Sequence, residues 1–144
     1  IEKDTPIQIR NPLATRPWQH VLEPISGYLL LAAELYNSPE KYSGAWNFGP
    51  SSKEVRTVHE VAKAMVQHRG KGKVVITGSA EQHHEAMLLQ LNCDKAHQIL
   101  GWHPRWHVEE TLNATAEWYK SIIEGGDAEI ITRKQLHQYF NELL

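Results

Sequence analysis

Residues 11–36, NPLATRPWQHVLEPISGYLLLAAELY, place a proline-interrupted segment directly before an amphipathic pattern, and this junction decides the fold class. Each proline removes a backbone donor and biases the preceding residue away from helix, so a loop is expected over residues 11–19. Apolar residues then recur at helical spacing, which predicts a helix over residues 23–37 with Pro24 in its first turn. The stretch therefore predicts a strand-to-helix corner.

The rest of the chain alternates short apolar runs with amphipathic segments. The capping pair Thr57 and Glu60 marks the start of a second helix. Strands are expected at residues 5–10, 45–49, 73–78 and 88–92, and further helices at residues 93–100, 109–124 and 132–143. Four short strands and about five helices indicate an α/β chain, with an α+β-like character. A strand pattern almost at the first residue suggests that the chain begins within a fold.

Composition narrows the class of protein. The 144 residues fit a single domain over residues 1–144, and a formal charge of −2 without single-sign blocks argues against nucleic-acid or membrane partners. The longest apolar run, at residues 28–33, is too short to span a bilayer, and the N-terminus does not resemble a signal peptide. The single cysteine, Cys93, excludes an internal disulfide, so we expect a cytoplasmic protein.

Most catalytic and metal-binding patterns are missing from the sequence. The nine histidines include no HExxH pair, and residues 83–89, HHEAMLL, lack metal-ligand spacing. Cys93 is better explained as a small residue packed at a strand–helix junction than as a nucleophile. Neither the GxSxG elbow nor the GxxxxGK[ST] phosphate loop occurs. No catalytic and no metal-binding residue is therefore predicted.

Arg16 is the strongest candidate for ligand contact on residue chemistry. It lies in a loop between a strand and a helix, and its guanidinium could hold a phosphate with two hydrogen bonds. Pairing with a carboxylate, with Trp18 in the core, explains the same residues equally well. Arg56 and the His84–Glu85 loop could converge on the same ligand, although spacing alone cannot decide this.

Three segments together resemble a known enzyme family. They are residues 9–36, IRNPLATRPWQHVLEPISGYLLLAAELY, residues 45–50, AWNFGP, and residues 83–119, HHEAMLLQLNCDKAHQILGWHPRWHVEETLNATAEWY. In this order they resemble the C-terminal half of CDP-glucose 4,6-dehydratases, which are extended short-chain dehydrogenase/reductases. The resemblance implies the C-terminal substrate-binding lobe of an extended Rossmann-type enzyme.

The resemblance implies a reaction that this chain could not complete alone. The family uses NAD to oxidise C4 of the hexose, eliminates water across C5–C6 and returns hydride to C6, giving CDP-4-keto-6-deoxyglucose for bacterial surface polysaccharide such as O-antigen. Its glycine-rich NAD fingerprint and Tyr-x-x-x-Lys pair belong to the N-terminal half, and neither occurs here. We therefore expect no cofactor in this chain, the N-terminal NAD-binding domain to be absent, and no dehydratase activity alone.

Residue by residue, the resemblance implies a substrate site at Arg16, Arg56, His84 and Glu85. Arg16 matches an arginine that contacts the nucleotide, whereas Asn11, Trp18 and His20 are expected to be local scaffolding. The expected partners are a CDP-sugar and either the missing N-terminal lobe or a second copy. The alternative is a truncated, non-enzymatic module that dimerises or binds a partner through its exposed apolar face.

Overall fold

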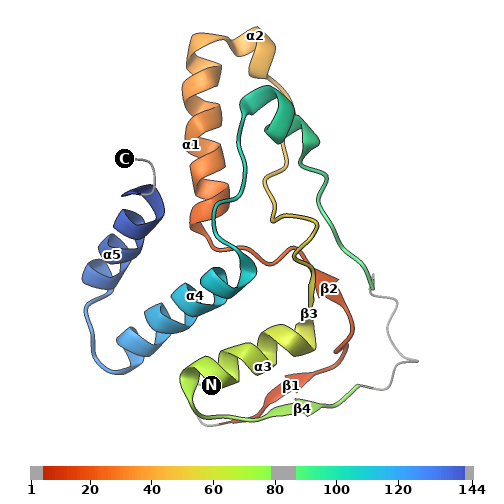
Figure 1. Cartoon of the computed structure of the whole chain (residues 1–144), viewed down its shortest axis with the longest axis vertical. Helices are drawn as coiled ribbons and strands as arrows, with labels where there is room; N and C mark the ends of the chain where they lie inside the picture. The colour runs from red at the N-terminus through yellow and green to blue at the C-terminus, as the bar shows by residue number, and fades with distance from the viewer. Residues whose placement is uncertain (1–4, 79–86, 142–144) are drawn as a thin grey trace.

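The structure, a computed structural model, describes residues 5–78 and 87–141 (Figure 1). Short strands in the first half alternate with helices, and the second half is helical. The elements are β1 (Ile7–Ile9), β2 (Thr15–Arg16), α1 (Leu22–Asn37), α2 (Pro39–Tyr42), β3 (Arg56–Thr57), α3 (Val58–Arg69), β4 (Val74–Ile76), the π-helical turn η1 (Ala96–Leu100), α4 (Val108–Ile123) and α5 (Ala128–Asn141). The predicted α/β class is confirmed.

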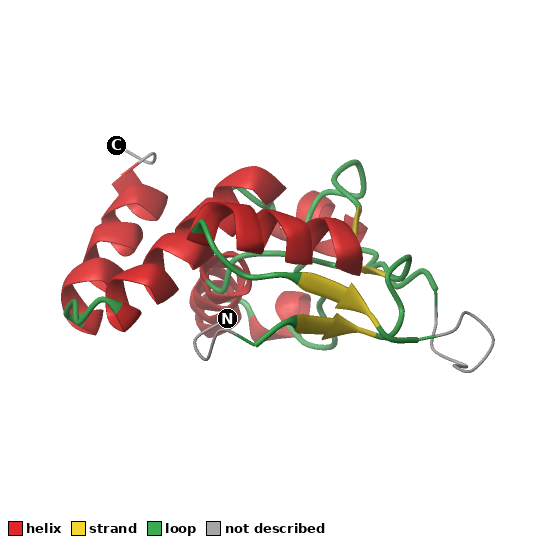
Figure 2. Cartoon of the chain, turned by 90° about the horizontal axis from the view of Figure 1, so that it is seen from below, coloured by secondary structure: helices red, strands yellow, loops and turns green. Residues whose placement is uncertain are grey.

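Two small sheets organise the first half of the chain. β1 and β4 pair in parallel, with Ile9 opposite Ile76, and α3 packs against both strands (Figure 2). β2 and β3 pair antiparallel. The strands predicted at residues 5–10 and 73–78 are therefore confirmed, although both are shorter than expected.

The strands predicted at residues 45–49 and 88–92 are wrong: both segments are irregular and join no sheet in the described part of the chain. Hydrogen bonds from side chains to backbone carbonyls hold the two segments in place. Asn47 donates to the Asn92 carbonyl at 3.1 Å, and Lys95 donates to the Ala45 carbonyl at 3.0 Å. A short apolar run gives the same sequence pattern whether or not its backbone finds a partner strand.

Local signals placed the helices more accurately. The predicted capping box at α3 is confirmed: Thr57 Oγ1 accepts from Glu60 N at 3.2 Å, and Glu60 accepts from Thr57 N at 2.7 Å. α5 begins four residues before the predicted residue 132, because the Asp127 carboxylate accepts hydrogen bonds from Glu129 N and Ile130 N. The sequence prediction missed α2 and the two-residue strands β2 and β3.

Two apolar clusters form the core. The first joins α1, α2 and η1, and Gly27 of α1 belongs to it because the Phe48 ring occupies the space that a Cβ would need. The second lies between α3 and α4. Its buried members are Val61, Val108 and Leu112, with Trp18, Ala64 and Met65 packed against them. None of the described helices is long and apolar enough to cross a membrane.

A buried carboxylate joins the start of α1 to the second half of the chain. Glu23 is 1% exposed and accepts hydrogen bonds from the backbone N–H groups of Arg105, at 3.1 Å, and Trp106, at 2.8 Å. It also accepts from the Tyr139 hydroxyl of α5 at 2.7 Å. Three donors from two distant segments satisfy one acid, so this group fixes the corner before α1 against the loop before α4.

Candidate functional site

Arg16 and Arg56 are brought together by the β2–β3 ladder. They are direct partners in the antiparallel register, next to the pair Thr15 and Thr57. Directly opposed residues project their side chains from the same face, with Cβ atoms roughly 5 Å apart. Two arginines that lie forty residues apart in sequence therefore form one cationic pair, which we call the arginine pair.

A proline and two hydrogen bonds to neighbouring segments hold the β2–β3 ladder in place. Pro17 follows β2 immediately and cannot donate to a sheet, so the strand ends at Arg16. The Trp18 indole N–H then crosses to the Arg56 carbonyl at 3.0 Å, while its ring packs against the α3–α4 cluster. On the other side of the ladder, the first N–H of α3, from Val58, donates to the Ala14 carbonyl at 2.9 Å. Strand, corner and helix start are thereby joined.

The two guanidiniums have different surroundings. Arg16 donates from Nη1 to the Thr15 carbonyl at 2.7 Å. It lines a cavity of about 360 Å³ over β1 and α3, and a narrow cavity of about 20 Å³ beside Ser51 and Leu89. Arg56 lines neither cavity; its Nη2 lies 3.7 Å from a carboxylate oxygen of Glu109. The structure therefore brings both predicted arginines together, but only Arg16 lines a described cavity.

Glu54 binds the start of α4, and its carboxylate is close enough to Arg56 to feel its charge. Glu54 accepts from Val108 N at 2.7 Å and forms a short contact with His107 Nδ1. Burial alone would raise the pKa of Glu54, but the hydrogen bonds from His107 and Val108 outweigh it and lower the pKa. The same hydrogen bond, together with the charge of Glu54, raises the pKa of His107.

The other two predicted site residues, His84 and Glu85, lie outside the described residues. The next described residue, Met87, contacts β2 and the loop before it. The Met87 carbonyl accepts a hydrogen bond from Thr15 N at 2.9 Å, and the Met87 sulfur lies 3.7 Å from Asn11 Nδ2. Within residues 5–78 and 87–141, no group of three or more His, Cys, Asp or Glu side chains could hold a metal ion.

Sequence reasoning missed two features near the site. Glu54 and His107 are 53 residues apart, and neither belongs to a motif that would suggest their contact. A pocket beside His20 was also missed, because its walls come from α4 and α5 as well as from the corner before α1. The only sequence signal for that pocket was the unusual composition of the RPWQH stretch.

No family model matches the chain. Among curated proteins, it is 41% identical over 140 residues to CDP-glucose 4,6-dehydratase of Salmonella typhimurium, covering 97% of this chain and 39% of that protein. It is 28% identical over 111 residues to UDP-glucose 4-epimerase 3 of Oryza sativa subsp. japonica, covering 77% of this chain and 29% of that protein. The chain thus spans well under half the length of these relatives.

Solved structures share the fold at lower sequence identity. A UDP-glucose 4-epimerase of Thermotoga maritima, solved with UDP-glucose, matches with a TM-score of 0.65 and 21% identity, over 85% of this chain and 37% of its own. A dTDP-glucose 4,6-dehydratase of Bacillus anthracis, solved with NAD, matches with a TM-score of 0.63 and 19% identity, over 83% and 36%.

The structural matches define the class: this chain has the fold of part of a Rossmann-type short-chain dehydrogenase/reductase. The sequence match then identifies the kind of enzyme to which the chain is related. Over 97% of its own residues, the chain is a homologue of CDP-glucose 4,6-dehydratase, consistent with a C-terminal portion of such a protein. The resemblance predicted from the sequence is confirmed.

Proposed function

We propose that these residues form the substrate-binding part of a CDP-glucose 4,6-dehydratase, in which Arg16 binds the diphosphate of CDP-glucose and Arg56 contributes beside it. The observation that carries the proposal is the direct pairing of these two arginines across β2 and β3. The sequence match to a protein of that name supports the choice of substrate.

The chemistry of the arginine pair suits a diphosphate. Like charges directly opposite one another in a ladder repel, and an anion bound between them removes that repulsion. A guanidinium presents a planar fork of N–H donors that matches two phosphate oxygens. Arg16 lines both cavities, so it is assigned as the principal anion ligand, and Arg56, which lies 3.7 Å from Glu109, is assigned as the secondary one.

The remaining chemistry would belong to the rest of a longer protein. This chain has no glycine-rich dinucleotide fingerprint and no Tyr-x-x-x-Lys pair, so its residues are assigned no contact with NAD and no proton transfer. NAD would supply the oxidation at C4 and the return of hydride to C6, giving CDP-4-keto-6-deoxyglucose. The part played by this chain is to bind and orient the nucleotide sugar, in the cytoplasm and ahead of surface-polysaccharide synthesis.

The exposed face of α1 supports a covering partner. Four apolar residues, Val21 directly before α1 and Tyr28, Leu29 and Tyr36 on it, are between 59% and 90% exposed. Such an apolar stripe marks an interaction surface. The partner in this proposal is the N-terminal lobe that the relatives have in addition.

The test measures CDP-glucose and NAD binding by isothermal titration calorimetry, in this chain joined to the N-terminal part of the Salmonella relative. Arg16→Ala is expected to weaken CDP-glucose binding at least tenfold, through loss of a charge-assisted hydrogen bond, and to leave NAD binding unchanged. Arg133→Ala, which removes an exposed arginine on α5, is the matched control. If Arg16→Ala weakens the binding of CDP-glucose and of NAD equally, or weakens the binding of neither, Arg16 has a structural role instead.

The 144 residues alone are expected to give no 4-keto product with NAD. Dehydratase activity of the isolated chain would contradict the division of labour proposed here. Activity restored only when the N-terminal part is added would support it.

A further inference from the structure

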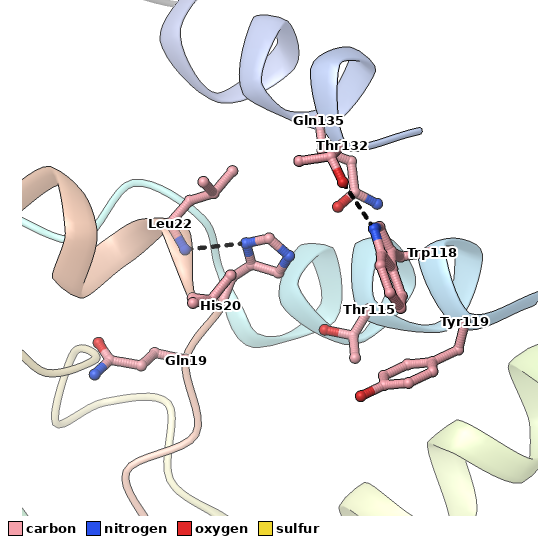
Figure 3. A pocket seen from close by; sticks show the side chains of 9 residues that line it. Gln19, His20, Leu22, Thr115, Trp118, Tyr119, Thr132 and Gln135 are labelled. Atoms are coloured by element: carbon pink, nitrogen blue, oxygen red, sulfur yellow. Dashed lines mark hydrogen bonds between the residues drawn. The ribbon is translucent and has the colours of Figure 1, made fainter. Parts of the chain in front are cut away.

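A pocket separate from the arginine pair opens between the start of α1, α4 and α5 (Figure 3). Its volume is about 450 Å³, within the range of small-molecule sites. Its lining shares no residue with the two cavities beside Arg16. None of the described residues that line it is Asp, Glu, Lys or Arg, so it offers hydrogen bonds without a formal side-chain charge.

His20 supplies a fixed donor to this pocket. The side chain is 7% exposed, and its Nδ1 accepts a hydrogen bond from Leu22 N at 3.3 Å. The ring proton of the neutral imidazole is therefore on Nε2, which makes no hydrogen bond with any described residue. Figure 3 shows this nitrogen on the side of the ring that faces α4. Burial lowers the pKa of His20, which favours the neutral form.

Gln135 supplies a fixed acceptor from α5. It is 4% exposed, and its amide nitrogen donates to the Ala114 carbonyl of α4 at 2.7 Å. That bond fixes the orientation of the amide and leaves Oε1 as its acceptor, without a hydrogen bond to any described residue. In both His20 and Gln135, one polar atom is tied to the backbone and the other remains available to a ligand.

Trp118 of α4 provides a flat wall of the pocket. Its indole N–H donates to Thr132 Oγ1 at 3.0 Å, so the ring is anchored and its polar atom is satisfied (Figure 3). An anchored indole offers a face on which a planar ring can stack. Polar groups held in place by backbone hydrogen bonds need little reorganisation when a ligand binds.

We propose that this pocket binds a flat, uncharged ring carrying a carbonyl oxygen and an N–H group, with the ring against Trp118, the carbonyl accepting from His20 Nε2 and the N–H donating to Gln135 Oε1. A nucleobase and an aryl carboxamide both have this chemistry. A carboxylate of the same shape does not, since it has no donor for Gln135 and finds no side-chain cation in the lining.

The test compares benzamide with benzoate, two rings of nearly the same shape that differ in charge and in the N–H donor. Each is titrated into the 144-residue chain while ¹H–¹⁵N spectra follow the tryptophan indole resonances. Benzamide is expected to shift the Trp118 indole signal but not the Trp46 indole signal. Trp46 lies away from the pocket lining, in the apolar cluster of α1, α2 and η1, where its indole N–H donates to the Tyr42 carbonyl. Benzoate is expected to bind at least tenfold more weakly. Uracil, titrated in parallel, shows whether a ring lactam is preferred to an exocyclic amide.

Two variants test the assigned atoms. His20→Phe keeps a ring against Trp106 but removes the donor, and Gln135→Leu keeps the side-chain volume but removes the acceptor. Each is expected to weaken benzamide binding about fivefold, the effect of one neutral hydrogen bond. Glu40→Ala, at an exposed position of α2 outside the pocket lining, is the control and should bind as the unaltered chain does.

The proposal is overturned if benzoate binds as well as benzamide, if no uncharged probe moves the Trp118 signal, or if folded His20→Phe and Gln135→Leu both bind benzamide normally. The comparison of probes on the unaltered chain remains decisive should either variant fail to fold. Because the pocket and the arginine pair share no residue, failure here leaves the CDP-glucose proposal intact, and the reverse also holds.

Discussion

Two corners of this chain contain nearly the same residues and use them in opposite ways. The first, residues 16–20, reads RPWQH, and the second, residues 104–107, reads PRWH. Arg16 of the first corner lines two cavities at the proposed substrate site. Arg105 of the second donates from Nη1 to the Tyr139 carbonyl at 3.2 Å, and its guanidinium lies 5.3 Å from the centre of the Tyr139 ring. One arginine lines the proposed ligand site and the other packs on an aromatic ring.

The difference comes from what each corner is attached to. The first is held by the β2–β3 ladder and by the Trp18 indole, which leaves its arginine at the face of a sheet. The second is held by its backbone, whose N–H groups at Arg105 and Trp106 are bound by the buried carboxylate of Glu23. The two corners are therefore parts of one assembly, since Glu23 follows the first corner and fixes the second. Residue composition alone did not distinguish a ligand contact from a packing contact.

The largest expected effect comes from removing the acid that joins the corners. Glu23→Ala removes the buried acceptor of two backbone N–H groups and of the Tyr139 hydroxyl, and we expect it to lower the free energy of unfolding by about 4 kcal/mol. Urea denaturation followed by circular dichroism measures this. Glu40→Ala, at an exposed position of α2, is the control and should change the stability by less than about 0.5 kcal/mol. A loss below about 1 kcal/mol for Glu23→Ala would show that the corners fold independently.

A smaller effect is expected from the second arginine. Arg105→Ala removes a hydrogen bond and the cation–π contact with Tyr139, and should cost about 2 kcal/mol of unfolding free energy. Arg133→Ala, in an exposed pair with Glu129, should cost less than about 0.5 kcal/mol. The same urea measurement applies to both. If Arg105→Ala has no more effect than this control, the contrast between the two corners in the use of their arginines is lost.

The smallest effect is expected at His107, the last residue of the second corner. Its pKa is raised in the folded chain by Glu54, so its protonated form stabilises the fold below the unfolded pKa of about 6.5, and this stabilisation is lost as the pH rises through the folded value. The lowered pKa of Glu54 keeps that carboxylate charged until the pH falls below about 4.5. The contact therefore acts from about pH 4.5 to somewhat above pH 6.5.

Melting temperatures measured across this range for the unaltered chain and for His107→Gln give the contribution as a difference. The difference should be largest near pH 5.5 and should vanish at alkaline pH. The buried His20 has a lowered pKa and opposes this trend, but it is common to both chains and cancels. A difference that grows as the pH rises would contradict the assignment.

The sequence by itself determined the helical part of this fold and the relationship to a known family. Capping residues, glycines and apolar periodicity act over a few residues, so the start of α3 and the course of α1 and α4 could be predicted from local chemistry. The RPW stretch likewise carried the resemblance that the comparison with the Salmonella protein confirmed. Arg16 could be named from the same stretch, and Arg56 from its place just before the second predicted helix.

Only the tertiary structure decided which segments are paired and which polar groups meet. The sequence could not show that residues 45–49 find no partner strand among residues 5–78 and 87–141. Nor could it show that Arg56 lies opposite Arg16, or that Glu23 binds donors more than 80 residues away. Nor did His20 and Gln135, on separate segments, suggest a shared pocket. Each of these features depends on contacts between residues distant along the chain. Local propensity does not encode such contacts, because a buried donor or acceptor is satisfied by whichever group the packing brings to it.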